Sequence, residues 1–365
     1  MKPMIKSRKM HALGLLASCL LLFSCNKDLA KPVPTPYVPP AGSTIMSLLD
    51  GANFTLLKAA VTRAGLNTAL NTPTNVFTVF APDDAAFAAS GISLPVINGL
   101  PVATLTSILQ YHLIGGQRLA AASIRDQFPN NQMQSMLMIA PPSAQLPPGY
   151  RMPLSISRRG TAAWANQIPV KQADVQASNG VIHVVAGMLA PPDSVLAQIM
   201  AVDPSYSYLM AAVARADAGP PPGAPQLAPL LANALANFTV FAPTNEAFIA
   251  AYTALGLGAA GPITPQSVNL LPSATVWGIV AYHVQGFRTF SVNLAQGAST
   301  INSILGGPPT APPQIFNVTG AGVQVRGPGN VIPGTTTPYS ANVTVANKHA
   351  INGVIHRVDA VLLPQ

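Results

Sequence analysis

Apolar residues recur along the chain in short runs whose spacing switches between that of a strand and that of a helix. The run FTVFAP (77–82) is rich in β-branched and aromatic residues and ends in proline, which predicts a strand that stops there. In the next string, DDAAF (83–87), Asp83 stands where an N-cap is expected, and Asp84 would favour the positive end of a helix dipole. This pattern predicts a strand that leads directly into a helix.

Two further apolar patterns follow in the same half of the chain. A helix that ends near His112 is predicted, because Leu105, Ile108 and Leu109 precede this histidine at i, i+3, i+4, i+7 spacing. The string NGVIHVV (179–185) opens with Asn-Gly, which is a strong turn signal, and continues as a strand with His183 among its alternating residues.

The same patterns return later in the chain in the same order. FTVFAPTNEAF begins at 238, GIVAYHVQGF at 278 and INGVIH at 351, so the three offsets are 161 (from 77), 171 (from 107) and 173 (from 178). Thr244 takes the N-cap place of the second copy, Glu246 lies in its first helical turn, and His283 ends its apolar stripe. A period of this length indicates a domain duplication rather than a solenoid. We call residues 43–190 domain 1 and residues 191–365 domain 2.

These phrases resemble the characteristic segments of the fasciclin domain family: TVFAP, a Tyr-His pair after an amphipathic helix, and NGVIH followed by an apolar strand. The resemblance covers residues 43–190 and 193–364. It implies the α+β fold class, with two tandem fasciclin-like domains that are each a compact wedge of two small β-sheets with packed helices. It also implies adhesion or matrix association at a cell surface, without catalysis.

The resemblance also singles out residues within each copy. The Tyr-His neighbourhood, linked to receptor binding in animal members, corresponds to Tyr111 and His112, and to Tyr282 and His283. The family's last strand usually carries an aspartate, which is present here as Asp359. Domain 1 has Ala186 at that place, so we expect it to lack a polar contact that domain 2 keeps.

The first residues form a leader rather than part of either domain. A basic start is followed by the apolar run ALGLLASCLLLF (12–23), which predicts a secretory signal peptide over 1–24. The ending LLFSC resembles a bacterial lipobox and predicts lipidation of Cys25; an ordinary signal with an incidental cysteine is the alternative. Proline-rich residues 25–42 predict a tether. We therefore expect a lipid-anchored protein of the cell envelope, on the outer membrane, in the manner of the Bacteroidetes lipoproteins that CNKD (25–28) resembles.

Composition narrows the functional class. Only 8% of the residues are charged and 37 are proline, which suits an extracytoplasmic protein. Four of the nineteen Lys and Arg residues precede Cys25, which leaves fifteen against eleven acidic residues. Of the two cysteines, Cys19 lies inside the leader, so no disulfide framework exists. Nucleic acid is not an expected partner of such an exported protein.

The candidate chemistry of the motif histidines is sparse. His112 pairs with His183, and His283 with His356, but the sequence holds no HExxH, CxxC or nucleophile-elbow motif. Glu246 is the only glutamate. We therefore expect no catalytic residue, no metal and no cofactor, and interpret the histidines as buried structural residues; a metal or acid–base site is the alternative.

One feature of charge points to a partner. Residues 113–171 hold six basic residues and one acidic residue, whereas domain 2 holds five of each. Arg158 and Arg159 precede a glycine in a predicted hairpin turn, and Arg151 lies nearby. Because a guanidinium can grip a carboxylate in a bidentate way, these three arginines predict binding of acidic polysaccharide. A solvated turn is the alternative.

The favoured function is adhesion or binding of a macromolecule, whether a glycan, a matrix component or another surface protein. A structural or accessory subunit of a surface complex is the first alternative. An enzyme acting on glycans is the second.

Overall fold

The structure is a computed structural model that describes residues 42–126, 130–139, 149–306 and 311–364. The predicted signal peptide, Cys25 and all of the tether except its last residue lie outside the described residues, so the lipid anchor stays a prediction. Over the ranges that are described, no helix combines the length and the apolar character that a membrane crossing requires.

Domain 1 is built on one seven-stranded sheet in the order β2-β1-β7-β6-β5-β4-β3. The strands are β1 (Phe77–Pro82), β2 (Leu113–Gly115), β3 (Asn131–Met138), β4 (Arg151–Arg159), β5 (Ala162–Ala165), β6 (Ile168–Ala177) and β7 (Gly180–Val185). β1 is parallel to β7, with Phe77 opposite Gly180, and antiparallel to β2. The TVFAP and NGVIH phrases are therefore the two central neighbours of the sheet.

Domain 2 repeats this arrangement in the order β10-β11-β12-β13-β14-β8-β9. Its strands are β8 (Phe238–Pro243), β9 (Val284–Gln285), β10 (Gly297–Ile301), β11 (Gln314–Thr319), β12 (Gly322–Arg326), β13 (Ala341–Ala350) and β14 (Gly353–Val358). β8 is parallel to β14, with Phe238 opposite Gly353, and antiparallel to β9. The internal repeat in the sequence is thus a repeat of topology and register.

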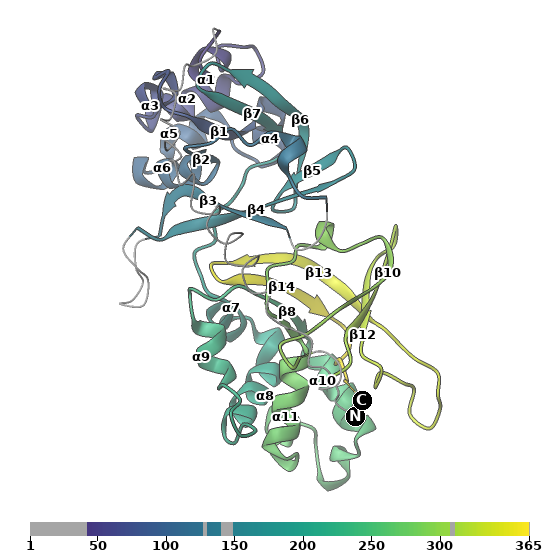
Figure 1. Ribbon diagram of the computed structural model, residues 1–365. Helices are drawn as coiled ribbons and strands as arrows, with labels where there is room; N and C mark the ends of the chain where they lie inside the picture. The colour runs from purple at the N-terminus through teal and green to yellow at the C-terminus, as the bar shows by residue number, and fades with distance from the viewer. Residues whose placement is uncertain (1–41, 127–129, 140–148, 307–310, 365) are drawn as a thin grey trace, which may run out of the picture. The chain divides into compact units, whose positions relative to one another are not determined.

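Helices pack against part of each sheet and leave the other strands free of them (Figure 1). The helices of domain 1 are α1 (Ile45–Leu48), α2 (Thr55–Arg63), α3 (Asn67–Asn71), α4 (Asp84–Ala89), α5 (Leu94–Gly99), α6 (Val102–Tyr111) and the 3₁₀ turn η1 (Ala121–Ser123). Those of domain 2 are α7 (Leu196–Val202), η2 (Pro204–Tyr206), α8 (Ser207–Asp217), α9 (Leu227–Ala232), α10 (Asn245–Ala254), η3 (Leu257–Ala260), η4 (Pro265–Leu270), α11 (Ser273–Tyr282) and η5 (Ser291–Asn293).

The predicted strand-to-helix phrase is confirmed in both domains. Asp83 caps α4 by accepting a hydrogen bond from the Ala86 N–H at 2.8 Å, and Thr244 caps α10 in the same way. Asp84 does more than favour the dipole, because its carboxylate accepts the N–H groups of Thr55 and Leu56 at 3.2 and 2.9 Å. The phrase therefore also caps α2, a helix that begins 29 residues earlier.

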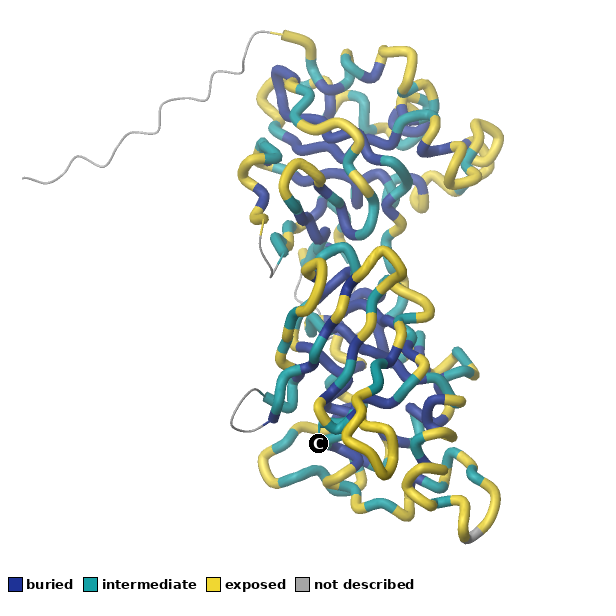
Figure 2. Tube along the Cα trace, turned by 90° about the vertical axis from the view of Figure 1, so that its right-hand side faces the viewer, coloured by how far each residue is buried: buried dark blue, intermediate teal, exposed yellow. Residues whose placement is uncertain are grey.

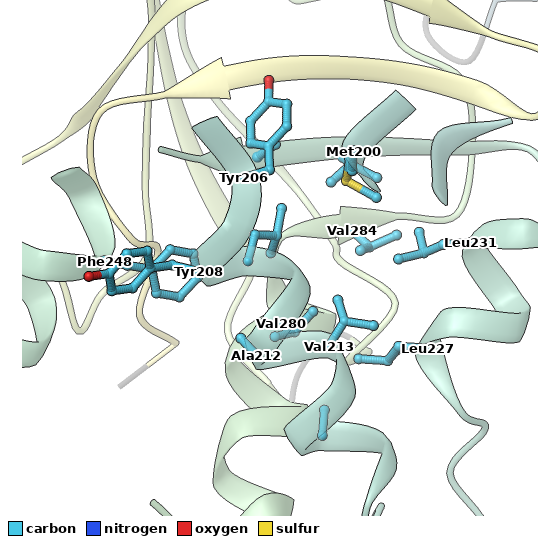
Figure 3. Close-up of a cluster of buried hydrophobic side chains, with 14 of the residues drawn as sticks. Met200, Tyr206, Tyr208, Ala212, Val213, Leu227, Leu231, Phe248, Val280 and Val284 are labelled. Carbon is cyan, nitrogen blue, oxygen red and sulfur yellow. The ribbon is translucent and has the colours of Figure 1, made fainter. Parts of the chain in front are cut away.

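Each central strand is buried on both faces and separates two apolar clusters. In β1, Phe77, Val79 and Ala81 pack with the helices, while Phe80 packs with β4, β5 and the far side of the sheet. In β8, Val240 belongs to the helical cluster and Phe241 to the other. Figure 3 shows part of the helical cluster of domain 2. Burial on both faces explains why these strands read as continuous apolar runs, since neither face meets water (Figure 2).

The expected pair of small sheets in each domain proves to be one continuous, curled sheet. In domain 1, β6 pairs with β5 through residues 168 and 169 and with β7 through residues 170–177. The ladder is broken by register shifts around Gln172, and Asp174 adopts a positive φ of 59°. Such bulges bend a strand and increase its twist, so a single strand can serve both halves. The α+β class is confirmed.

Candidate functional site

The Tyr-His histidine is held between two backbone groups in each domain. His112 is the C-cap residue of α6; its Nδ1 lies 2.8 Å from the Ile108 carbonyl, and its Nε2 accepts the Leu189 N–H at 3.0 Å. His283 of α11 repeats the arrangement with Ile279 and Leu362, at 2.8 Å for both contacts. A ring that donates from one nitrogen and accepts at the other is neutral. Burial accordingly lowers the pKa of both histidines to about 4.

The tyrosines of the same motif are also inside the protein. Tyr111 and Tyr282 are completely buried, and their hydroxyls donate to the carbonyls of Pro153 and Pro313 at 3.3 and 2.9 Å. Burial raises the pKa of each phenol to about 12. The four residues of the Tyr-His neighbourhood therefore connect the last turn of a helix to the sheet, and none of them offers a surface to a partner.

The NGVIH histidines support the bulge that bends the sheet. The Nδ1 of His183 accepts the N–H of Asp174 at 3.2 Å, and its Nε2 lies 2.8 Å from the Leu119 carbonyl. His356 makes the matching contacts with Asn347 and Thr289 at 3.3 and 2.9 Å. Asn347 has a φ of 66°, a backbone region that Asp and Asn tolerate better than most residues.

The asparagine of NGVIH has a role that sequence reasoning missed. Asn179 is completely buried; its Oδ1 accepts the Ile45 N–H at 2.8 Å, and its Nδ2 donates to the carbonyls of Leu70 and Thr72 at 2.8 and 3.2 Å. Asn352 makes the same three contacts, with the Leu196 N–H at 2.8 Å and with two carbonyls at 2.9 Å. The Asn-Gly signal indicates only a turn, which the structure confirms, and gives no sign of this clamp.

A second missed pair consists of arginines that bind the same turn. Arg118 donates to the carbonyls of Ala177 and Gly180 at 2.8 Å. Arg288 is 2% exposed and donates to the Ile351 carbonyl at 2.7 Å, with its Nη1 2.6 Å from His349 Nε2. The two arginines occupy equivalent places, because the carbonyl of the residue before each one accepts a hydrogen bond from the hydroxyl of a matching threonine, Thr78 in β1 or Thr239 in β8. The sequence gives only one sign of this contact, which is an arginine a few residues after each Tyr-His pair.

All four motif histidines make hydrogen bonds to backbone groups of their own domain. Within the described ranges, no group of three or more His, Cys, Asp or Glu residues could hold a metal ion. Each motif histidine is committed to backbone partners on both nitrogens, which leaves no ring nitrogen free for acid–base work.

Two of the three candidate arginines are occupied by backbone carbonyls. Arg158 and Arg159 end β4 just before the turn at Gly160, so the predicted basic hairpin turn is present. Arg158 donates to the carbonyls of Ile124 and Gly160 at 3.0 and 2.9 Å. Arg159 donates to the Val292 carbonyl at 2.9 Å and also to that of Leu294. These contacts compete with any ligand for the same donors.

Arg151 lies at the other end of β4, so the structure does not gather the three arginines in one place. Its Nη1 donates to the Met136 carbonyl at 2.7 Å, and the side chain borders an open groove of domain 1. Polysaccharide binding by these arginines stays a prediction, and Arg151 is the member of the set that borders a cavity within domain 1.

Asp359 makes a contact for which domain 1 has no side-chain equivalent. Its carboxylate accepts the backbone N–H of Asn342 at 2.7 Å and the Asn342 side-chain amide at 2.8 Å. The corresponding Ala186 is joined to Pro169 by a backbone hydrogen bond of 2.9 Å.

Comparison with known proteins places both halves of the chain. A sequence model of the fasciclin domain matches residues 52–191 and 223–364. The transforming growth factor-beta-induced protein ig-h3 of Sus scrofa is 34% identical over 157 residues, and that of Oryctolagus cuniculus 32% over 159; each match covers 42% of this chain. Protein sll1483 of Synechocystis sp. is 33% identical over 152 residues, which are 41% of this chain and 74% of that protein.

The chain spans about a fifth of the length of both ig-h3 proteins, 20% in each case. A solved FAS1 domain pair from the insect cell adhesion molecule Fasciclin I is 18% identical, with a TM-score of 0.35, over 84% of this chain and 96% of that one. Because the domain model matches twice and covers most of the sequence, the chain belongs to the fasciclin domain family.

Proposed function

We propose that the protein is a lipid-anchored component of the cell envelope that binds another macromolecule through its fasciclin domains and carries out no catalysis. The observation that supports this most directly is the use of the motif residues. In both domains the histidines and tyrosines hold helices and sheet together and are 2% exposed or less, so they are not available to a substrate. What remains for function is the outer surface of each domain.

The anchor would hold that surface at the membrane. The apolar run that ends in LLFSC and the proline-rich segment after Cys25 support it. More than one acyl chain gives stable attachment, whereas a single chain is marginal. Cys25→Ser should leave unprocessed precursor or release the protein from the membrane fraction. Unchanged fractionation, together with a mature mass that lacks lipid, would contradict the anchor.

Binding is tested with the chain that lacks the leader, residues 26–365, immobilised on beads. Retention of intact cells, or of defined glycans on an array, is the expected result. If it retains neither, the protein acts as a structural or accessory subunit of a surface complex instead. A screen against glycosidic and ester substrates tests the enzyme alternative, and turnover of any of them would overturn the non-catalytic assignment.

A further inference from the structure

An open groove of about 920 Å³ lies in domain 1 between β3, the last strand of the sheet, and the segments that flank β1 and β2. At one end the two sides meet closely, because a Cβ on Gly115 would approach the Met136 sulfur to 2.6 Å. Gly116 then turns the chain away with a φ of 79°, and a Cβ there would meet no atom within 4 Å. The groove opens where the chain leaves β2.

The side chains of the groove suit a polyhydroxylated ligand. Amide groups dominate its polar lining: Asn75, Gln117, Gln132 and Gln134. An amide can donate and accept at once, as sugar hydroxyls require of their partners. Gln132 and Gln134 are exposed and stand at alternate positions of β3, so they share one face of the strand. No carboxylate is among the residues that line the groove.

Arg151 is the charged residue of this lining, and it is partly fixed in place. Its Nη1 donates to the Met136 carbonyl at 2.7 Å and lies 3.8 Å from the Met136 sulfur, while within the described residues its Nε and Nη2 have no hydrogen-bond partner. A guanidinium that is already held through one of its nitrogens loses less freedom when it binds a ligand. The Nε–H and one Nη2–H together match the two oxygens of a carboxylate.

We infer that this groove binds the uronate unit of an acidic oligosaccharide, with the carboxylate on Arg151 and the ring hydroxyls on the surrounding amides. This inference rests on the proposed binding function and names its ligand class. An acidic peptide added as a strand to β3 fits less well. The ladder between β3 and β4 shifts register between Gln134 and Met138, and Met136 packs against Gly115 there, so only a short stretch of edge is regular.

Domain 2 differs at two of these positions. The tyrosine hydroxyls bind Pro153 in domain 1 and Pro313 in domain 2, which makes Ala311 the counterpart of Arg151. Phe287 is the counterpart of Gln117, because each of their carbonyls accepts a hydrogen bond from the equivalent threonine of its domain. The Ile304 N–H also donates to the Val284 carbonyl at 2.7 Å, which joins the segment after β10 to β9. We therefore assign the uronate site to domain 1 alone.

The test is calorimetric titration of residues 26–365 with tetragalacturonic acid, its methyl ester and a neutral tetrasaccharide. The acid should bind, and the ester and the neutral sugar should bind at least about tenfold more weakly, because the charge-assisted pair is lost. Arg151→Gln should weaken binding by a similar factor, and Arg151→Lys by less. Arg125→Gln, which removes an exposed arginine of domain 1 outside the groove, is the matched control and should leave binding within about twofold.

A second variant covers the case in which Arg151→Gln disturbs the fold. Gln134→Glu places a carboxylate in the groove from an exposed position and should also abolish binding of the acid, with an unchanged melting temperature. Absence of binding by the wild type, equal binding of acid and ester, or full binding by both variants would overturn the inference. So would Arg151-dependent binding of tetraglutamate without binding of the saccharide. Retention of cells by the same immobilised chain is measured separately, so failure of the groove is distinguishable from failure of the binding function.

Discussion

His112 in domain 1 and His283 in domain 2 agree contact for contact, with matching partners at 2.8–3.0 Å, whereas Arg151 in domain 1 has Ala311 as its counterpart. The same contrast holds elsewhere in the two domains. The buried asparagine clamps repeat atom by atom, and the exposed aspartate of domain 2 is an alanine in domain 1. The contacts that repeat in both domains are those in which a side chain forms hydrogen bonds with buried backbone groups.

The physical reason lies in the cost of failure at each kind of position. A buried N–H or carbonyl without a partner costs about 1–3 kcal/mol, so a side chain that serves several of them is difficult to replace. An exposed side chain at a sheet edge satisfies its polar atoms with water, so its identity is free to differ between domains. The difference teaches where to look for function: in the positions at which the two domains do not match.

Acidification should separate the domains most strongly. Burial lowers the pKa of His283 and His356 to about 4, and that of His349 well below its usual range with help from Arg288. Their neutral forms stabilise the fold fully above the unfolded pKa of about 6.5, and this stability is lost as the pH falls toward 4. For one histidine whose pKa is about 4 instead of 6.5, the loss by pH 4.5 is about 2.5 kcal/mol, so domain 2 should lose roughly 5 kcal/mol or more.

Domain 1 should lose less, because it has two such histidines rather than three: His112, with a pKa of about 4, and His183, whose pKa is lowered by burial. Each domain contains one tryptophan, Trp164 or Trp277, so 5-fluorotryptophan gives one ¹⁹F signal for each domain. Urea titrations at pH 7 and pH 4.5 should show domain 2 losing more stability. Equal losses, or a larger loss in domain 1, would contradict the assignment of neutral buried histidines.

The asparagine clamps should give the next largest effect, and the same one in both domains. Asn179→Ala or Asn352→Ala leaves one buried N–H and two carbonyls without their partner, which should cost about 3–5 kcal/mol in the domain concerned. The ¹⁹F signals assign the loss to one domain. Asn317→Ala, at an exposed position of β11, is the control and should stay within about 0.5 kcal/mol. A clamp variant as stable as this control would show that water replaces the amide.

The Tyr-His histidines should follow closely. His112→Ala and His283→Ala should each cost about 2–4 kcal/mol, because a buried ring and two hydrogen bonds are lost together. The measurement is the same urea titration at pH 7. Stability within about 0.5 kcal/mol of the wild type would mean that the ring is replaceable by water, and a functional role for it would have to be considered again.

The part of the fold that could be predicted from the sequence is the part with local causes. The strand FTVFAP, the cap at Asp83, the helix ending at His112 and the Asn-Gly turn each depend on residues a few positions apart. The repetition of these phrases, with the family resemblance, indicated two domains of the α+β class. Burial of the histidines followed from their place on apolar stripes.

The contacts that could not be predicted join distant parts of the chain. Asn179 meets the Ile45 N–H across 134 residues, and Arg118 meets the Gly180 carbonyl across 62. Neither pairing leaves a spacing signal. The three predicted arginines do not gather in one place for a related reason. Arg151 begins the nine-residue strand β4, and Arg158 and Arg159 are its last two residues, so the extended backbone holds them apart.

Substitution of the exposed Asp359 should change the free energy of unfolding least, and the reverse substitution at Ala186 in domain 1 should not have the opposite effect. Asp359→Ala removes an acceptor from the backbone and side chain of Asn342, but both residues are exposed, so the expected cost is about 0.5–1 kcal/mol in domain 2. The reverse change, Ala186→Asp, should stabilise domain 1 by nothing measurable, because the partner there is Pro169, which has neither an N–H nor a side-chain donor. Combining Ala186→Asp with Pro169→Asn supplies that donor and should recover part of the contact, as a double-mutant cycle would show. A stabilisation by Ala186→Asp alone would mean that the carboxylate finds another donor, and that the two edges are less different than their sequences indicate.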